Sequence, residues 1–372
     1  MIGRNHRFNL WLLFLMLPLF ILSACAGDSE RDREGEFQVI RDMTGREISV
    51  PAEINRVIGL RAGALRMLTY LDAADLVAAI EEPERTAIRP YLLAYPELKE
   101  RPGAGPLMGG DLELIVSARP DVIFMTFTSR GQADELQRRT GIPVVALEYG
   151  DFSNRRDLFF DSLKLMAAVL GKEDRAKELF EYVQGSLQEL QQRTEDISFE
   201  ERPRVYIGGV SYSGTQGISS TEPHYPPFRF IGVRNVAEKL DEGRINPIQG
   251  TFIDKEQLMM WNPDVLFVDL ASLSITQAEI SRGTPLYSGL SALQQGQVYG
   301  LLPYNNYAAN YENILANAWY AARVLFPDEF DDVIFEEKLD EIYEAFLGKP
   351  VYEELKEAWG GFRQLEAGSY QQ

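Results

Sequence analysis

The chain has 372 residues, of which 45% are hydrophobic and 25% charged, so it holds enough apolar material for one or two packed cores. Its 37 Lys and Arg against 56 Asp and Glu give a net charge of −19, and it has no basic run that could neutralise a nucleic-acid backbone. The single cysteine excludes a disulfide framework and a cysteine-based zinc cluster. Composition therefore excludes a disordered chain, a nucleic-acid binder and a disulfide-stapled domain.

The first residues have the form of a bacterial export signal. Two arginines precede an apolar run over 10–22, which is too short and too close to the terminus for a membrane-spanning helix. The run ends in Leu-Ser-Ala-Cys, which resembles the lipobox of bacterial lipoproteins. The sequence predicts a signal peptide over 1–24, lipidation of Cys25 and a polar, flexible tether over 25–36. An ordinary signal peptide with an incidental cysteine is the alternative.

Strand and helix patterns alternate from residue 37 onward. Apolar or β-branched runs predict strands at 37–41, 47–50, 56–60, 122–127, 142–147, 204–207, 265–269 and 297–302. Apolar residues at helical spacing predict helices at 64–71, 112–118, 133–140, 155–170, 173–194, 255–261, 312–326, 335–346 and 351–362. This alternation is typical of an α/β protein whose parallel-rich sheets are covered by helices.

The two halves of the chain repeat one pattern. Glu113 precedes Pro120 by 7 positions, and Glu256 precedes Pro263 by 7 positions. Each proline is followed by Asp and an apolar run. Because a proline cannot continue a helix, this pattern predicts that a helix ends there and a strand follows. The segment 173–194 between the halves has no proline and a continuous apolar stripe, so it forms one amphipathic helix of about six turns.

The sequence therefore predicts two similar lobes joined by one long helix. The expected divisions are an N-terminal α/β lobe over 37–152, a helical segment with the bridging helix over 153–200, and a C-terminal α/β lobe over 201–372.

These features together resemble a known family. The lipobox, the run Arg-Asp-Met-Thr-Gly-Arg-Glu-Ile-Ser-Val-Pro over 41–51, the paired Glu…Pro-Asp-Val units and the central helix are similar to the substrate-binding lipoproteins of iron-complex ABC importers. That family binds ferric siderophores, haem or cobalamin, and the resemblance covers 37–362. It implies the helical-backbone class of periplasmic binding protein: two Rossmann-like lobes bridged by a single long α-helix, small hinge motion, and ligand held in the interlobe cleft.

The resemblance also implies one exposed glutamate in each lobe that docks onto arginines of the transmembrane permease. By position these are Glu113 and Glu256. The alternative is that each is a first-turn acid favoured by the helix dipole, and both descriptions can hold at once.

Ligand-binding residues are expected beyond the carboxyl ends of the strands, where open α/β sheets place their crevices. The candidates are Arg61, Thr128 and Tyr149 in the first lobe, and Ser211, Tyr212, His224, Tyr225, Arg229, Asp269, Tyr304 and Asn305 in the second. Aromatic and amide groups suit a bulky metal chelate or another polar small molecule, and the arginines match anionic groups.

A bare metal ion is a poor candidate ligand, because transition-metal sites use several imidazoles and His224 is the one histidine left after the signal. No metal site is therefore expected. A ferric siderophore or related chelate is the first choice. Haem, a corrinoid and an oxyanion such as molybdate or tungstate remain open. A hydrolase that uses Ser211 and His224 is the rival class, although Gly-Val-Ser-Tyr-Ser over 209–213 lacks the second glycine of a nucleophile elbow.

The sequence therefore predicts a non-enzymatic, lipid-anchored receptor on the extracytoplasmic side of the membrane. It is expected to be monomeric, to carry no intrinsic cofactor, to capture a small metal complex, and to deliver that complex to an ABC permease driven by a separate ATPase.

Overall fold

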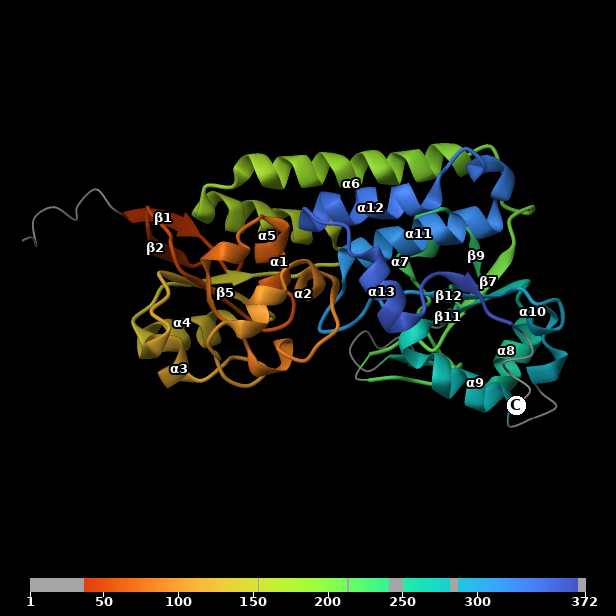
Figure 1. Cartoon of the computed structure of the whole chain (residues 1–372), viewed down its shortest axis with the longest axis horizontal. Coiled ribbons are helices and arrows are strands. Elements are labelled where there is room, and N and C mark those ends of the chain that lie inside the picture. Colours follow the sequence, from red (N-terminus) through yellow and green to blue (C-terminus); the bar gives the residue numbers. More distant parts are fainter. Residues whose placement is uncertain (1–36, 153, 213, 241–249, 282–286, 367–372) are drawn as a thin grey trace, which may run out of the picture.

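The computed structural model describes residues 37–152, 154–212, 214–240, 250–281 and 287–366. The predicted signal peptide, tether and Cys25 lie outside this part of the chain. Two α/β lobes lie side by side, and the long helix α6 (Glu173–Thr194) runs along one side of both (Figure 1). The predicted two-lobed α/β fold with a bridging helix is confirmed. In the described part of the chain, no helix has the length and apolar character needed to span a bilayer.

The N-terminal lobe is built on a four-stranded parallel sheet. Its strand order is β4 (Val77–Ala79), β3 (Val57–Leu60), β5 (Val122–Thr126), β6 (Val144–Leu147). All residues of these strands are buried, because helices cover both faces of the sheet. One face packs against α1 (Ala64–Tyr70) and α5 (Arg156–Leu170), and the other against α3 (Leu112–Ser117) and α4 (Arg130–Thr140).

The C-terminal lobe repeats this plan with a five-stranded sheet. Its strand order is β13 (Arg363–Gln364), β12 (Val298–Leu301), β11 (Val265–Asp269), β7 (Arg204–Gly208), β9 (Arg234–Asn235), and only β13 is antiparallel to its neighbour. The helices of this lobe are α7 (Pro226–Phe230), α8 (Lys255–Trp261), α9 (Leu273–Ser281), α10 (Ser291–Gln294), α11 (Tyr311–Leu325), α12 (Phe335–Leu347) and α13 (Tyr352–Trp359). Strands β8 (Ser220–Thr221) and β10 (Thr251–Phe252) form a separate antiparallel pair.

The repeated Pro-Asp pairs have the same structural role in both lobes. The carboxylate of Asp121 accepts a hydrogen bond from the backbone N–H of Arg56 (2.8 Å), which leads into β3. The carboxylate of Asp264 accepts the corresponding bond from the N–H of Arg204 (2.8 Å) at the start of β7. Each arginine also donates to a carbonyl at the end of the helix before the aspartate, at 2.7 Å and 3.0 Å. The sequence repeat therefore specifies a joint between helix end and strand start.

Helix α6 is not the only tie between the lobes. The end of α12 reaches the N-terminal lobe, where the Tyr95 hydroxyl donates to the carbonyl of Leu347 (2.9 Å) and the Lys349 ammonium donates to the carbonyl of Ala94 (2.7 Å). In Figure 1, α12 lies alongside α6 over the C-terminal lobe and extends toward α1. The two lobes thus share a helical side, and they separate toward the opposite side.

Most predicted element boundaries agree with the structure to within two residues. The helix predicted over 351–362 is shorter: α13 ends at Trp359, because Gly360 takes the left-handed conformation (φ 82°) that ends many helices. The helices α2 (Pro90–Ala94), α7 and α9 were not predicted, since five residues are too few to show a period and α9 has no distinct apolar face.

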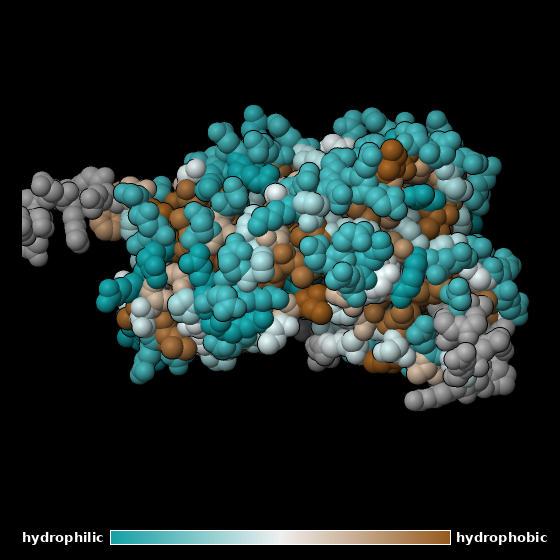
Figure 2. Space-filling view, in the orientation of Figure 1, coloured by the Kyte–Doolittle hydropathy of each residue, from teal (hydrophilic) through white to brown (hydrophobic). Residues whose placement is uncertain are grey.

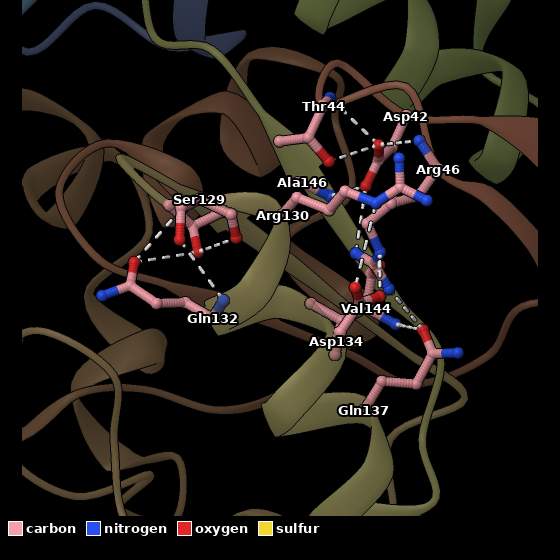
Figure 3. Close-up of polar contacts among 11 residues, drawn as sticks. Asp42, Thr44, Arg46, Ser129, Arg130, Gln132, Asp134, Gln137, Val144 and Ala146 are labelled. Atoms are coloured by element: carbon pink, nitrogen blue, oxygen red, sulfur yellow. Dashed lines mark hydrogen bonds and ion pairs between the residues drawn. The ribbon is translucent and has the colours of Figure 1, made fainter.

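The antiparallel hairpin of β1 (Phe37–Arg41) and β2 (Glu47–Pro51) is attached to the first lobe through its turn. Arg46 donates to the carboxylate of Asp42 (3.1 Å), to Asp134 of α4 (2.7 Å) and to the carbonyl of Val144 (3.0 Å), as Figure 3 shows. The Arg46 side chain is 4% exposed and that of Asp42 is fully buried. A buried ion pair therefore holds the hairpin against α4 and β6.

Replacing Arg46 with Met is expected to lower the free energy of unfolding by about 3 kcal/mol, because the Asp42 carboxylate would lose its buried counter-charge. Urea denaturation measures this change. The matched control is Arg138→Met, which removes a pair with Glu135 in which both side chains are more than half exposed, and it should change the stability little. Equal effects of the two substitutions would contradict the assigned role.

Candidate functional site

The carboxyl ends of the parallel strands meet where the two lobes touch. From the N-terminal lobe this contact includes Arg66, Glu81 and Tyr149, and from the C-terminal lobe it includes the loop 304–310 that follows β12. We call this contact the seam. Figure 2 shows the surface indented between the lobes on the side away from α6, next to the seam. This is the position at which open α/β sheets form their binding crevices.

Arg66 of α1 joins the lobes from within the seam. Its side chain is completely buried, and its guanidinium donates to the carbonyls of Ala309 (2.7 Å), Asn306 (3.1 Å) and Tyr307 (3.2 Å) in the other lobe. It also donates to the hydroxyl of Tyr149, which itself donates to the Ala309 carbonyl (2.6 Å). One arginine therefore holds three carbonyls of a loop that lies about 240 residues away in the chain.

The charge of Arg66 is balanced inside the protein. Burial by itself lowers the pKa of Arg66, but the neighbouring tyrosines and Glu312 raise it, so the group stays protonated. Burial raises the pKa of Glu312, and Arg66 opposes that rise. The Glu312 carboxylate also accepts a hydrogen bond from the hydroxyl of Tyr70 on α1. This second buried contact crosses between the lobes beside the first.

Tyr307 extends from the seam loop into the N-terminal lobe. Its hydroxyl donates to the Glu81 carboxylate (2.6 Å), and the guanidinium of Arg89 lies over its ring, 4.9 Å from the ring centre. Tyr307 and Ala308 both have positive φ angles, 54° and 65°, a conformation that costs energy for residues other than glycine. The contacts with Arg66, Glu81 and Arg89 keep the loop in this strained form.

In the C-terminal lobe, polar groups gather at the ends of β7 and β11. The Asn305 side chain donates to the carbonyl of Ser211 (2.9 Å), and the Ser211 hydroxyl lies 3.2 Å from that of Ser272. The carboxylate of Asp269 accepts from the N–H groups of Ala271 (2.9 Å) and Ser211 (3.5 Å). Burial raises the pKa of Asp269 to about 7. Three of the predicted residues, Ser211, Asp269 and Asn305, thus lie together beside the seam loop.

Three predicted aromatic residues have mainly structural contacts. Tyr225 is 1% exposed, its ring packs edge to face against Tyr304 (5.3 Å), and its hydroxyl accepts from Asn317 (3.1 Å). Tyr212 donates to the Glu222 carboxylate (2.6 Å). These three tyrosines therefore pack within the C-terminal lobe next to the seam.

Other predicted residues lie apart from the seam. Arg229 is exposed, donates to Asn154 (2.7 Å) and lines a cavity of about 480 Å³ with Phe152 and Phe199. The backbone N–H of His224 donates to the Glu222 carboxylate (3.1 Å).

On the other lobe, Thr128 is partly exposed beside Ser129 at the start of α4. Arg61 directly follows β3, and its guanidinium donates to the side-chain oxygen of Gln132 on α4 (3.2 Å). The backbone N–H of Arg61 still donates to the seam residue Glu81 (2.9 Å), so only its side chain leaves the seam.

The seam also contains residues that sequence reasoning did not select. Arg66, Glu81 and Arg89 do not directly follow a predicted strand: Arg66 lies within an apolar helix, and the other two lie on a loop with no regular pattern. The one available signal was a charged residue among the apolar positions of 64–71, which gives no indication of its partner. Tyr307 stands at the end of the aromatic and amide run 304–307, and its contact with Glu81 depends on how the lobes are placed.

The two glutamates of the repeat are exposed on equivalent helices. Glu113 is in the first turn of α3, whose N-terminus is capped by the carboxylate of Asp111, and Glu256 is in the first turn of α8. Both helices lie on the parts of their lobes that face away from α6 (Figure 1).

The rival hydrolase was expected to use Ser211 and His224. The Ser211 hydroxyl lies 3.2 Å from the hydroxyl of Ser272. Within the described ranges, no group of three or more His, Cys, Asp or Glu side chains is placed to hold a metal ion. The geometry instead offers hydrogen-bond donors and acceptors at a contact between two lobes.

The raised pKa of Asp269 predicts a pH dependence of stability. The group binds its proton more tightly in the folded chain (pKa about 7) than in the unfolded one (3.8), so its stabilising contribution is complete below pH 3.8 and is lost as the pH rises through 7. Relative to Asp269→Asn, the wild type should lose about 1.4 kcal/mol per pH unit across this window. Urea denaturation at several pH values measures the slope, and parallel curves for the two proteins would contradict the assignment.

Comparisons with known proteins agree with this architecture. The model of a family described as periplasmic binding protein matches residues 67–304. The chain is 25% identical to the molybdate-binding protein MolA of Haemophilus influenzae over 352 residues, which cover 89% of this chain and 95% of MolA. The molybdate-bound structure of MolA has a TM-score of 0.65 at 22% identity, covering 84% of this chain and 98% of that one.

A structure of the TroA-like periplasmic binding protein FepB from Veillonella parvula is also similar, with a TM-score of 0.60 at 20% identity, and it covers 84% of this chain and 96% of that chain. The family match extends over more than half of the residues and includes both lobes and α6. The chain therefore belongs to the periplasmic binding protein family, as an extracytoplasmic solute-binding component of an ABC importer.

Proposed function

We propose that this protein is a lipid-anchored receptor that captures a metal complex in the cleft next to the seam and delivers it to an ABC permease. The observation that carries the proposal is the seam itself, where polar groups at the strand ends of two separate lobes meet beside an indentation of the surface. The receptor binds and releases its ligand without chemical change, and a separate ATPase supplies the energy for transport. Lipidation of Cys25 would keep the receptor near its permease.

The chemistry of the seam supports a ligand with an oxygen-rich, polar surface. Tyr307, Asn305 and Arg89 place polar side chains at or beside the contact between the lobes, where they donate to Glu81, Ser211 and Asn306 and would exchange these partners for a ligand. Donors of this kind recognise the carbonyl, hydroxyl and carboxylate oxygens of a metal chelate. A ferric siderophore or a related chelate is therefore our first candidate for the ligand.

An oxyanion such as molybdate or tungstate is the second candidate. It is favoured by the similarity to MolA along nearly the whole chain, since MolA is named for binding molybdate. The same donors could surround four oxygens of a small anion. The two candidates differ in size and in the metal they carry, which makes them separable by experiment.

Native mass spectrometry of the protein purified from its own host is expected to show a bound complex and to identify its metal. Iron would support the chelate, and molybdenum or tungsten would support the oxyanion. Thermal melting with ferrichrome, haemin, cyanocobalamin and sodium molybdate provides the second measurement, because a ligand that binds only the folded state raises the melting temperature. A ligand-free protein whose melting temperature none of the four compounds changes would contradict the proposal.

The exposed glutamates suit docking onto the permease. Glu113 lies next to Leu114, which is 44% exposed, and Glu256 lies four residues before Met260, which is 74% exposed. Exposed apolar side chains mark candidate contact surfaces, and a charge at their rim can steer a partner of opposite charge. We therefore assign one docking patch to α3 and one to α8.

The double variant Glu113→Ala with Glu256→Ala is expected to bind its ligand as the wild type does and to abolish uptake by cells. The matched control is Glu178→Ala with Glu181→Ala, which removes two exposed glutamates from α6 on the opposite side of the molecule. Uptake of labelled ligand in cells and thermal melting of the purified variants measure the two properties. Normal uptake by the α3 and α8 double variant would remove the docking assignment.

A further inference from the structure

The N-terminal lobe contains a cavity beside the seam, since the backbone N–H groups of its lining residues Arg61 and Gly109 donate to the seam residue Glu81 (2.9 Å and 3.2 Å). It has a volume of about 500 Å³ and lies between α3 and α4, over the outer face of the sheet. Its lining includes four apolar side chains, which belong to Met108, Leu112, Met125 and Leu136. A volume of this size is sufficient for a small organic molecule.

Arg61 brings a positive charge to this cavity. The residue is 8% exposed, and its guanidinium is held by the carbonyl of Phe127 and the side chain of Gln132 (3.2 Å). Its Nε atom is buried and makes no hydrogen bond to any residue in the described part of the chain. Burial lowers the pKa of Arg61, which means that the environment opposes its charge. The Nη2 atom of the same guanidinium also makes no hydrogen bond to a described residue, and unlike Nε it is not buried, so an anion in the cavity would give it a charge-assisted hydrogen bond.

The nearby acids do not supply that acceptor. The Glu81 carboxylate accepts from the backbone N–H of Arg61 (2.9 Å) and from the hydroxyl of Tyr307 (2.6 Å), and it makes no bond to the guanidinium. Burial raises the pKa of Glu81, so its negative charge is weakened. Glu135, at the exposed rim, is paired with Arg138 (2.6 Å). Arg139 also lines the cavity and pairs with Glu135 (4.0 Å), so the lining carries two arginines and one glutamate in a chain of charge −19.

We propose that this cavity is a second binding site, which takes a small organic carboxylate with an apolar body. The planar fork of the guanidinium matches a carboxylate, and the methionine and leucine walls match the apolar body. The site lies within one lobe, so it does not depend on the identity of the cleft ligand or on the proposed transport role. It also gives Arg61 a function in a place other than the predicted cleft.

Benzoate is a suitable probe, because it combines a carboxylate with a compact apolar ring. In protein labelled with ¹³C at the methionine methyl groups, benzoate is expected to shift the NMR signals of Met108 and Met125, which line the cavity. The signals of Met259 and Met260, on α8 of the other lobe, should not move. Benzyl alcohol, which has the ring without the charge, should bind about tenfold more weakly.

Gly131 allows a matched pair of variants. It lines the cavity in the first turn of α4, and a Cβ atom added there would meet nothing within 4 Å. Gly131→Glu places a negative charge at the mouth and should weaken benzoate binding at least about tenfold, whereas Gly131→Gln, of the same size, should bind much more tightly than the glutamate variant. Arg61→Met should also lose binding.

Two results would overturn the site. One is equal benzoate affinity in the Gly131→Glu and Gly131→Gln variants, and the other is methyl shifts spread equally over both lobes. If Arg61→Met fails to fold, the comparison of benzoate affinity between Gly131→Glu and Gly131→Gln still tests the site. Ligand binding in the cleft is measured separately by melting with metal complexes, so failure of one assignment leaves the other in place.

Discussion

The buried guanidinium of Arg66 is the interaction on which the arrangement of the two lobes depends. It lies on a helix of the first lobe, and its acceptors are three backbone carbonyls of the second lobe. Such a group is costly to bury, and separating the lobes would exchange its bonds with the three carbonyls for bonds with water. Because Glu312 and Tyr70 form a second buried contact beside it, the lobes are joined at the seam as well as by α6. This double attachment favours small adjustments of the cleft over wide opening.

The strained loop after β12 follows from the same constraint. Tyr307 and Ala308 adopt left-handed backbone conformations because the loop must present its carbonyls to Arg66 and its phenol to Glu81 at the same time. Strain of this kind persists only where surrounding contacts hold it, and it is common at ligand sites. The seam loop therefore ties the two lobes together through contacts that its strained backbone makes possible.

Local patterns in the sequence predicted the elements well because they follow from local causes. The apolar stripe of 173–194, the buried β-branched strands and the Pro-Asp pairs each depend on a few neighbouring residues. The repeat around Asp121 and Asp264 corresponds to one specific contact, since each carboxylate accepts a hydrogen bond from the backbone at the start of the neighbouring strand. The short helices escaped prediction because five residues cannot display a helical period.

The site shows where local information ends. By itself the sequence determined the α/β class, the two lobes and the bridging helix, since periodicity and proline placement act over a few residues. Only the tertiary structure decided that Arg66 lies at the seam, that Tyr225 belongs to the packed interior, and that the side chain of Arg61 turns into a separate cavity. The positions of Arg66 and Tyr225 depend on contacts between residues far apart in the chain. The direction of the Arg61 side chain depends on its rotamer, which no sequence pattern records.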